Sequence, residues 1–176
     1  IKKTDVDITP WSGGQYSSKC PDGTNWLRRT DYRITGAWIS KGIIGFMWTA
    51  NKRGTDRPFP HVRVVRINEA TMLKTDEPDI WSPDYAYAYP DAYPNTNGDV
   101  GITLFLGGGL KNPSHLVGIY DDTSKKWRIK IAKEGTNGPQ DSKWGDYITV
   151  RSYAPANKDW IAAGYTLQGG KTQNET

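Results

Sequence analysis

The sequence predicts an all-β fold of four-stranded antiparallel repeats that is β-propeller-like and forms an incomplete propeller. The pair Asp-Tyr occurs three times, at residues 31–32, 84–85 and 146–147, with separations of 53 and 62 residues. Each pair is followed by short β-prone runs with turn residues between them. No stretch has a convincing helical period, and residues 67–73 are expected to form one helical turn at most. Four-stranded units at a period of roughly 40 to 50 residues or a little more are typical of propeller blades.

The first two strands of each unit follow directly from this pattern. A β-prone run, a turn rich in Gly, Asn, Pro or Lys, and a second apolar run come after every Asp-Tyr pair, which predicts a hairpin. The predicted strand pairs are 32–39 with 43–48, 85–90 with 100–105, and 147–153 with 160–165.

Third and fourth strands are predicted only in the first two units. Residues 60–65 and 114–119 have the pattern of third strands, and His61 and His115 occupy equivalent positions in them. A repeated structural role is favoured for these two histidines, because equivalent residues of different blades lie far apart. The fourth strands are a weaker one near 72–81 and a clearer one at 126–131 with alternating charges.

The repeat divides the chain into five parts. Residues 6–11, in the first part, are expected to form a strand of a preceding blade. About two and a half blades are present, so we expect the rest of the propeller on adjacent sequence, on a second chain or in a homo-oligomer. The predicted parts are 1–29 (preceding strand and loop), 30–82 and 83–133 (blade-like repeats), 134–170 (half repeat) and 171–176 (polar tail).

The charge pattern argues against a nucleic-acid partner, and the hydropathy argues against a membrane span. Lys and Arg number 23 against 19 Asp and Glu, a net charge of +4, and the two signs are interleaved along the chain. A nucleic-acid-binding protein needs a concentrated basic face, so no nucleic-acid partner is expected. No apolar run approaches the roughly 18 residues of a membrane span. Cys20 is the single cysteine, and its state is left open between a free thiol and a partner outside this chain.

Two segments resemble a known family. Trp144-Gly145-Asp146-Tyr147, followed by a Pro-containing turn and Trp160 to Gly164, resembles the "WGDY" blades of bacterial secreted proteins with sialidase-like (BNR-type) propellers. Tyr89-Pro90 with residues 97–101 looks like the first two strands of such a blade. The resemblance implies a sialidase-like propeller in a secreted or cell-surface protein.

The sequence also departs from the sialidases. Residues 121–127 match their Asp-box only in part, since the Gly of that motif is missing. Residues 32–35 resemble the start of their Arg-Ile-Pro motif, but the Pro is absent. None of Glu69, Glu77 and Glu134 lies in a recognisable catalytic setting. We therefore assign no catalytic residue and no metal ligand.

The Asp-Tyr pairs are the main candidates for a binding site. If each pair opens an innermost strand, their carboxylates lie at one height near the central channel, where they could bind a cation or sugar hydroxyls. The alternative is that each Asp caps a turn through neighbouring backbone N–H groups. Trp81 and Trp144 precede two of the pairs and are candidates for a partly exposed sugar-stacking face. The candidate ligand-binding residues are Asp31, Tyr32, Trp81, Asp84, Tyr85, Trp144, Asp146 and Tyr147.

The resulting functional expectation is a non-catalytic propeller segment. It would act as a scaffold or binding surface for another chain or for a glycan, in a secreted or surface protein. The alternative is part of a sialidase-like glycoside hydrolase that missing blades complete. No cofactor is expected, although the oxygen-rich residues 95–99 leave a calcium site open beside the favoured hairpin turn.

Overall fold

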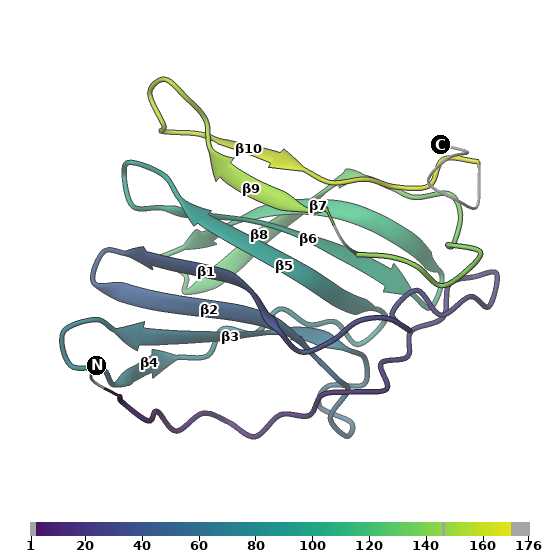
Figure 1. Cartoon of the computed structure of the whole chain (residues 1–176), viewed down its shortest axis with the longest axis horizontal. Helices are drawn as coiled ribbons and strands as arrows, with labels where there is room; N and C mark the ends of the chain where they lie inside the picture. Colours follow the sequence, from purple (N-terminus) through teal and green to yellow (C-terminus); the bar gives the residue numbers. More distant parts are fainter. Residues whose placement is uncertain (1–2, 146, 170–176) are drawn as a thin grey trace.

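The computed structural model describes residues 3–145 and 147–169, which form three antiparallel sheets (Figure 1). The first and second sheets have four strands each, in chain order, and the third is a hairpin of two strands. No helix occurs in the described residues, so the all-β prediction of four-stranded antiparallel repeats is confirmed. The strands are β1 (Ile34–Ser40), β2 (Ile43–Ala50), β3 (His61–Asn68), β4 (Lys74–Asp76), β5 (Ala86–Pro94), β6 (Val100–Gly108), β7 (Lys111–Asp121), β8 (Lys126–Lys133), β9 (Thr149–Ser152) and β10 (Trp160–Ala163).

The first two sheets face each other across an apolar core. Their facing residues include Trp38 and Met47 from the first sheet and Ile102, Leu104 and Leu106 from the second. Every residue of β6 is buried, because both faces of this strand are covered. A continuous apolar run is what such a doubly covered strand requires.

The other face of the second sheet carries a separate aromatic core. Phe105 of β6 lies under Trp144 and Tyr165, with ring centroids 5.3 and 5.4 Å away. Trp26 and Leu27, from the loop before β1, are fully buried in the same cluster. The second sheet is therefore the middle layer of the molecule.

The N-terminal segment does not form the strand predicted at 6–11. In the described part of this segment the backbone forms no strand and joins no edge of the sheet. Instead it lies over the outer face of the first sheet, where Trp11 meets Trp48 at 5.3 Å between ring centroids. The backbone N–H of Thr9 donates to Glu77 Oε1 at 2.9 Å. This segment covers the sheet rather than extending it.

Two further predictions can be compared in detail. Residues 67–73 form no helix, as expected: β3 continues to Asn68, and the N–H of Met72 donates to the carbonyl of Asn68 at 2.8 Å in a single turn. The weak fourth strand near 72–81 is only the three residues of β4. The strong fourth strand at 126–131 is confirmed as β8.

The hairpin turns of the three sheets are linked to one another by polar contacts. Lys41 Nζ lies 2.7 Å from Asp99 Oδ1, which joins the first and second hairpins. Asn95 Nδ2 donates to the carbonyl of Lys158 at 2.6 Å, which joins the second and third. Asn95 Oδ1 accepts the backbone N–H groups of residues 97 and 99, so the oxygen-rich segment forms the favoured hairpin turn. No helix of the described residues has the length and apolar character needed to cross a membrane.

Candidate functional site

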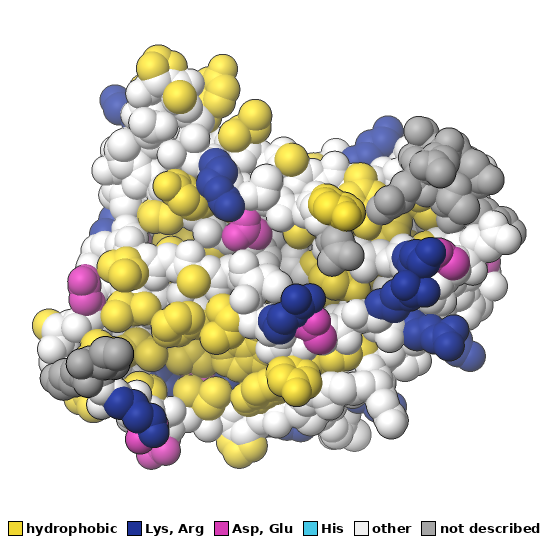
Figure 2. Space-filling model, viewed as in Figure 1, with side chains coloured by type: hydrophobic (Ala, Val, Ile, Leu, Met, Phe, Trp, Pro, Cys, Tyr) yellow, Lys and Arg dark blue, Asp and Glu magenta, His cyan; other side chains and the backbone are white. Residues whose placement is uncertain are grey.

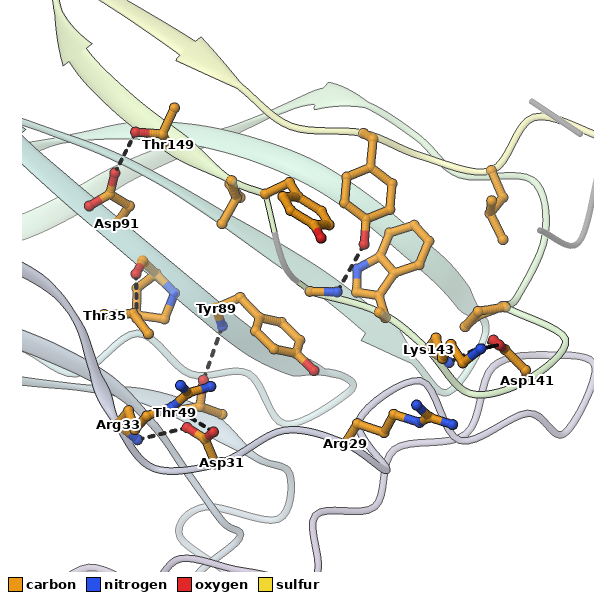
Figure 3. A pocket seen from close by; sticks show the side chains of 18 of the residues that line it. Arg29, Asp31, Arg33, Thr35, Thr49, Tyr89, Asp91, Asp141, Lys143 and Thr149 are labelled. Carbon is orange, nitrogen blue, oxygen red and sulfur yellow. Dashed lines mark hydrogen bonds and ion pairs between the residues drawn. The ribbon is translucent and has the colours of Figure 1, made fainter. Parts of the chain in front are cut away.

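A polar hollow of about 750 Å³ lies where β1, β5 and β9 approach one another. These are the first strands of the three sheets, and Figure 3 shows their side chains around the hollow with the loop before β9 on one side. The segment before β1 supplies the opposite rim through Asp31 and Arg33 (Figure 3). Residues from all three repeat units therefore line one site.

A bulge in β5 shapes the floor of this hollow. The pairing of β5 with β6 shifts register between Ala88 and Asp91, and Tyr89 has a φ of 56°. Pro90 lacks an N–H, so it cannot complete the ladder, which is where bulges are expected. The carbonyl of Pro90 accepts a hydrogen bond from Thr35 Oγ1 at 2.6 Å, and the N–H of Tyr89 donates to Thr49 Oγ1 at 3.0 Å. The bulge is thus held against the first sheet.

The bulge directs Asp91 toward the third sheet. Asp91 Oδ2 accepts hydrogen bonds from Thr149 Oγ1 at 3.1 Å, the N–H of Val150 at 2.9 Å and Arg151 Nη1 at 2.9 Å. Its other oxygen accepts the N–H of Ala92 at 2.9 Å. The side chain is only 15% exposed. Asp91 therefore anchors β9 to β5, and its oxygens are already engaged by the protein.

Cations outnumber carboxylates among the described lining residues. Arg33, Lys143 and Arg151 pair with Asp31, Asp141 and Asp91 at 2.7, 2.8 and 2.9 Å, as the close-up in Figure 3 shows in part. Arg29 is exposed and makes no ion pair with any described residue. Four cations against three carboxylates give the described lining residues a charge of +1. Figure 2 shows Lys and Arg side chains on this face of the molecule, while apolar side chains gather over the first sheet.

Two of the lining carboxyls are held ionised by these cations. Partial burial raises the pKa of Asp31, but hydrogen bonds and the charge of Arg33 outweigh it and leave the pKa below its ordinary value. The hydrogen bond from Lys143 lowers the pKa of Asp141. Both carboxyls are therefore negative at neutral pH.

An aromatic wall closes one side of the hollow. Trp144 and Tyr165 pack with ring centroids 4.6 Å apart, and the Tyr165 hydroxyl accepts the N–H of Gly145 at 2.9 Å. Trp144 is 5% exposed, yet its Nε1 has no hydrogen-bond partner among the described residues. Tyr147, by contrast, is 84% exposed and has a φ of 67°. The wall thus exposes the ring of Tyr147, while the Nε1–H of Trp144 is buried behind it.

Gly145 brings the loop before β9 close to the bulge. A Cβ at this position would lie 2.0 Å from Tyr89 Cζ, and the φ of 105° is one that favours glycine. Only a residue without a side chain lets the loop lie on the Tyr89 ring. The hollow therefore depends on a glycine next to an aromatic floor.

The predicted binding residues do not all meet at this site. Asp31, Trp144 and Tyr147 line the hollow. Tyr32 packs on Trp11 instead, at 5.9 Å between ring centroids. Trp81 lies under the Arg57 guanidinium at 4.4 Å from its ring centroid. Asp146 lies outside the described residues.

Asp84 and Tyr85 also lie away from the hollow. The backbone N–H of Asp84 donates to Ser82 Oγ at 3.1 Å, and Tyr85 packs against the core between the first two sheets. The hollow is lined on β5 by residues 89 to 91, which begin five residues after Asp84. Five residues of strand span roughly 16 Å. Asp31 and Asp84 thus both precede first strands, but not at one height.

The sequence reasoning missed most of the polar lining. Arg29, Lys143 and Arg151 come from three segments that are remote in sequence, and no local pattern marks them as neighbours. Asp91 had one usable signal, because a proline directly before it interrupts a predicted strand. Both histidines are buried within β3 and β7, and burial lowers the pKa of each. They lie outside the hollow, in separate sheets.

Comparison of the chain with protein-family models, with curated proteins and with solved structures found no match.

Proposed function

We propose that this chain is a segment of a sialidase-like, BNR-type β-propeller and that its hollow binds an acidic glycan without cleaving it. The arrangement of the sheets supports the propeller part of the proposal. They follow one another in chain order, and along one side β1 contacts β5 and β5 contacts β9 (Figure 1). Four-stranded blades set around a central channel, each with its first strand innermost, would bring their first strands side by side in this order. A secreted or cell-surface protein is the setting that the family resemblance implies.

The observation that carries the binding proposal is the composition of the hollow. Arg29, Arg33 and Arg151 line it together with the aromatic wall. Guanidinium groups bind carboxylates through paired hydrogen bonds, and aromatic rings accept the apolar face of a sugar. Tyr147, whose side chain is 84% exposed, offers such a ring, whereas Trp144 is buried behind it at 5% exposed.

The state of the carboxyls supports binding rather than hydrolysis. A glycosidase needs one carboxyl that keeps its proton near neutral pH and a second that is ionised. The pKa of Asp31 and that of Asp141 are lowered instead of raised, and Asp91 is engaged by β9. We therefore assign the role of general acid to none of these three carboxyls, which are the carboxyls of the described lining.

Titration calorimetry with an acidic and a neutral oligosaccharide of equal length tests this proposal. We expect the intact chain to bind the acidic oligosaccharide and to bind the neutral one more weakly by a factor of roughly ten or more. Arg29→Ala should weaken binding of the acidic ligand by about 10- to 100-fold, because a charge-assisted hydrogen bond contributes about 1.5 to 3 kcal/mol.

Arg28→Ala is the matched control for this experiment. Arg28 is exposed and directly precedes Arg29, but it does not line the hollow. Equal losses for the two variants would contradict a specific site and indicate general charge attraction. Cleavage of the acidic oligosaccharide by the intact chain would replace the binding proposal with the glycoside hydrolase.

A further inference from the structure

Among the described strands, β10 is the outer edge of the third sheet. In the first sheet β2 lies between β1 and β3, and in the second β6 lies between β5 and β7. The strand at the same position of the third sheet, β10, pairs with β9 alone among the described strands. The backbone groups of β10 that point away from β9 are therefore available to another strand.

The third hairpin is joined to the second sheet at their hairpin turns, as the second sheet is joined to the first. Trp160 lies directly on Gly101, where a Cβ would be 2.6 Å from its ring, and Trp160 Nε1 donates to the carbonyl of Tyr93 at 2.8 Å. The turn before β10 is linked to the turn before β6, as that turn is linked to the one before β2. β10 is thus the structural equivalent of β2 and β6.

The outer edges of the three sheets differ in their chemistry. Two of the three residues of β4, Lys74 and Asp76, are charged, and β8 carries four cations in eight residues. Charged side chains on an edge strand are a usual protection against pairing with another strand. β10 has the sequence Trp-Ile-Ala-Ala and carries no charge. Its Ile161 is 56% exposed.

We infer that β10 is a strand-addition site for an antiparallel strand of the β3 and β7 type. The two complete sheets define this occupant, since β2 and β6 each receive such a strand in antiparallel register. It is an extended segment of largely uncharged residues that belongs to a further repeat of the same kind. The inference rests on the proposed propeller arrangement, and it does not involve the glycan-binding hollow.

Amide hydrogen exchange of the full chain tests this inference, with a synthetic peptide of residues 111–121 as the probe. We expect the peptide to slow exchange in residues 160–163 by roughly tenfold, which corresponds to about 1.4 kcal/mol of added pairing. A peptide of the same composition in scrambled order should leave exchange in β10 unchanged.

Two variants separate edge pairing from unspecific binding. Ile161→Lys should abolish the slowing, because a lysine on an edge strand opposes pairing. Ile131→Lys, on the already basic outer strand β8, should preserve it. Unchanged exchange in β10 with the peptide would overturn the inference. So would slowing that depends on protein concentration without peptide, because the occupant would then be a second copy.

These outcomes are distinguishable from failure of the proposed function. Loss of glycan binding in Arg29→Ala does not depend on the edge of β10. A chain that binds the glycan but not the peptide retains its proposed function and loses only the strand-addition site.

Discussion

The two interfaces between successive sheets are built on different principles. The first and second sheets meet across an apolar core that includes Met47, Ile102 and Leu104. The third sheet meets the second through the carboxylate of Asp91, through Trp160 and through the aromatic wall. The first interface is closed, whereas the second leaves a hollow of about 750 Å³ beside it. We expect the first interface to supply most of the stability, and the second provides the hollow that is the candidate site.

The largest effect should come from a cavity in the first interface. Leu104 is fully buried between the sheets, so Leu104→Ala should lower the free energy of unfolding by about 2 to 5 kcal/mol. Chemical denaturation measures this loss. Leu110→Ala is the control, because Leu110 is 93% exposed in the turn after β6 and should change stability by no more than about 0.5 kcal/mol. Similar losses for the two variants would contradict the apolar interface as the main source of stability.

A side chain added at Gly145 should disturb the second interface next. The new Cβ would clash with the Tyr89 ring, and the positive φ adds a cost of about 1 to 2 kcal/mol. Overpacking typically adds about 1 to 3 kcal/mol. Gly14→Ala separates these two costs, because Gly14 also has a positive φ but a Cβ at that position would meet nothing within 4 Å.

Both glycine variants can be compared by denaturation and by the near-ultraviolet circular dichroism of the aromatic residues. We expect Gly145→Ala to lose more stability than Gly14→Ala and to alter the aromatic signal, which the control should retain. Equal losses would mean that the contact between Gly145 and Tyr89 is not close.

The sequence predicts the closed interface better than the hollow. Strand positions follow from β-prone runs between turn residues, and the buried strand β6 is recognisable as an apolar run in which Thr103 is the one polar side chain. These signals are local, so they can be recognised without knowledge of the tertiary fold. The hollow depends on a bulge at Tyr89 and Pro90 and on side chains from three remote segments. Their proximity is a property of how the sheets stack, which no short motif encodes.

The three Asp-Tyr pairs illustrate the same limit. Their spacing predicts the beginnings of the first strands, and Asp31 and Asp84 do precede β1 and β5. However, the bulge makes the two strands inequivalent beyond that point. The polar position of β5 at the hollow is Asp91 rather than Asp84. A repeat in sequence thus locates elements more reliably than it locates a site.

Breaking the link between β5 and β9 should cost less unfolding free energy than a cavity in the apolar core. The loss should be confined to the third sheet. Asp91→Asn removes the charge that Arg151 and two other donors share, which should cost about 1 to 3 kcal/mol. We expect the loss to be local, so that amide exchange at Val150 accelerates while exchange in β6 does not. Asp99→Asn is the control, because Asp99 is 45% exposed and pairs with Lys41 at the surface. Acceleration of exchange throughout the second sheet would show that Asp91 supports more than the third hairpin.

The smallest effect should come from the ion pair on the rim of the hollow. Because the pKa of Asp31 is lower in the folded chain than its ordinary value of 3.8, the pair stabilises the fold above pH 3.8. That stabilisation is lost as the pH falls below 3.8 and the carboxyl takes up a proton. Asp31 and Arg33 are 43% and 79% exposed, so the contribution should stay below about 1 kcal/mol.

Comparing the intact chain with Asp31→Asn from neutral pH down into acid measures this contribution. The difference in unfolding free energy should be small at neutral pH and should shrink as the pH falls through the lowered pKa of Asp31, because the intact chain then loses the charge that the variant lacks. Asp5→Asn, which removes an exposed carboxylate outside the hollow, should show no such convergence. A difference between the intact chain and Asp31→Asn that is as large as the Leu104→Ala loss would mean that the second interface is held by charge as firmly as the first is held by apolar burial.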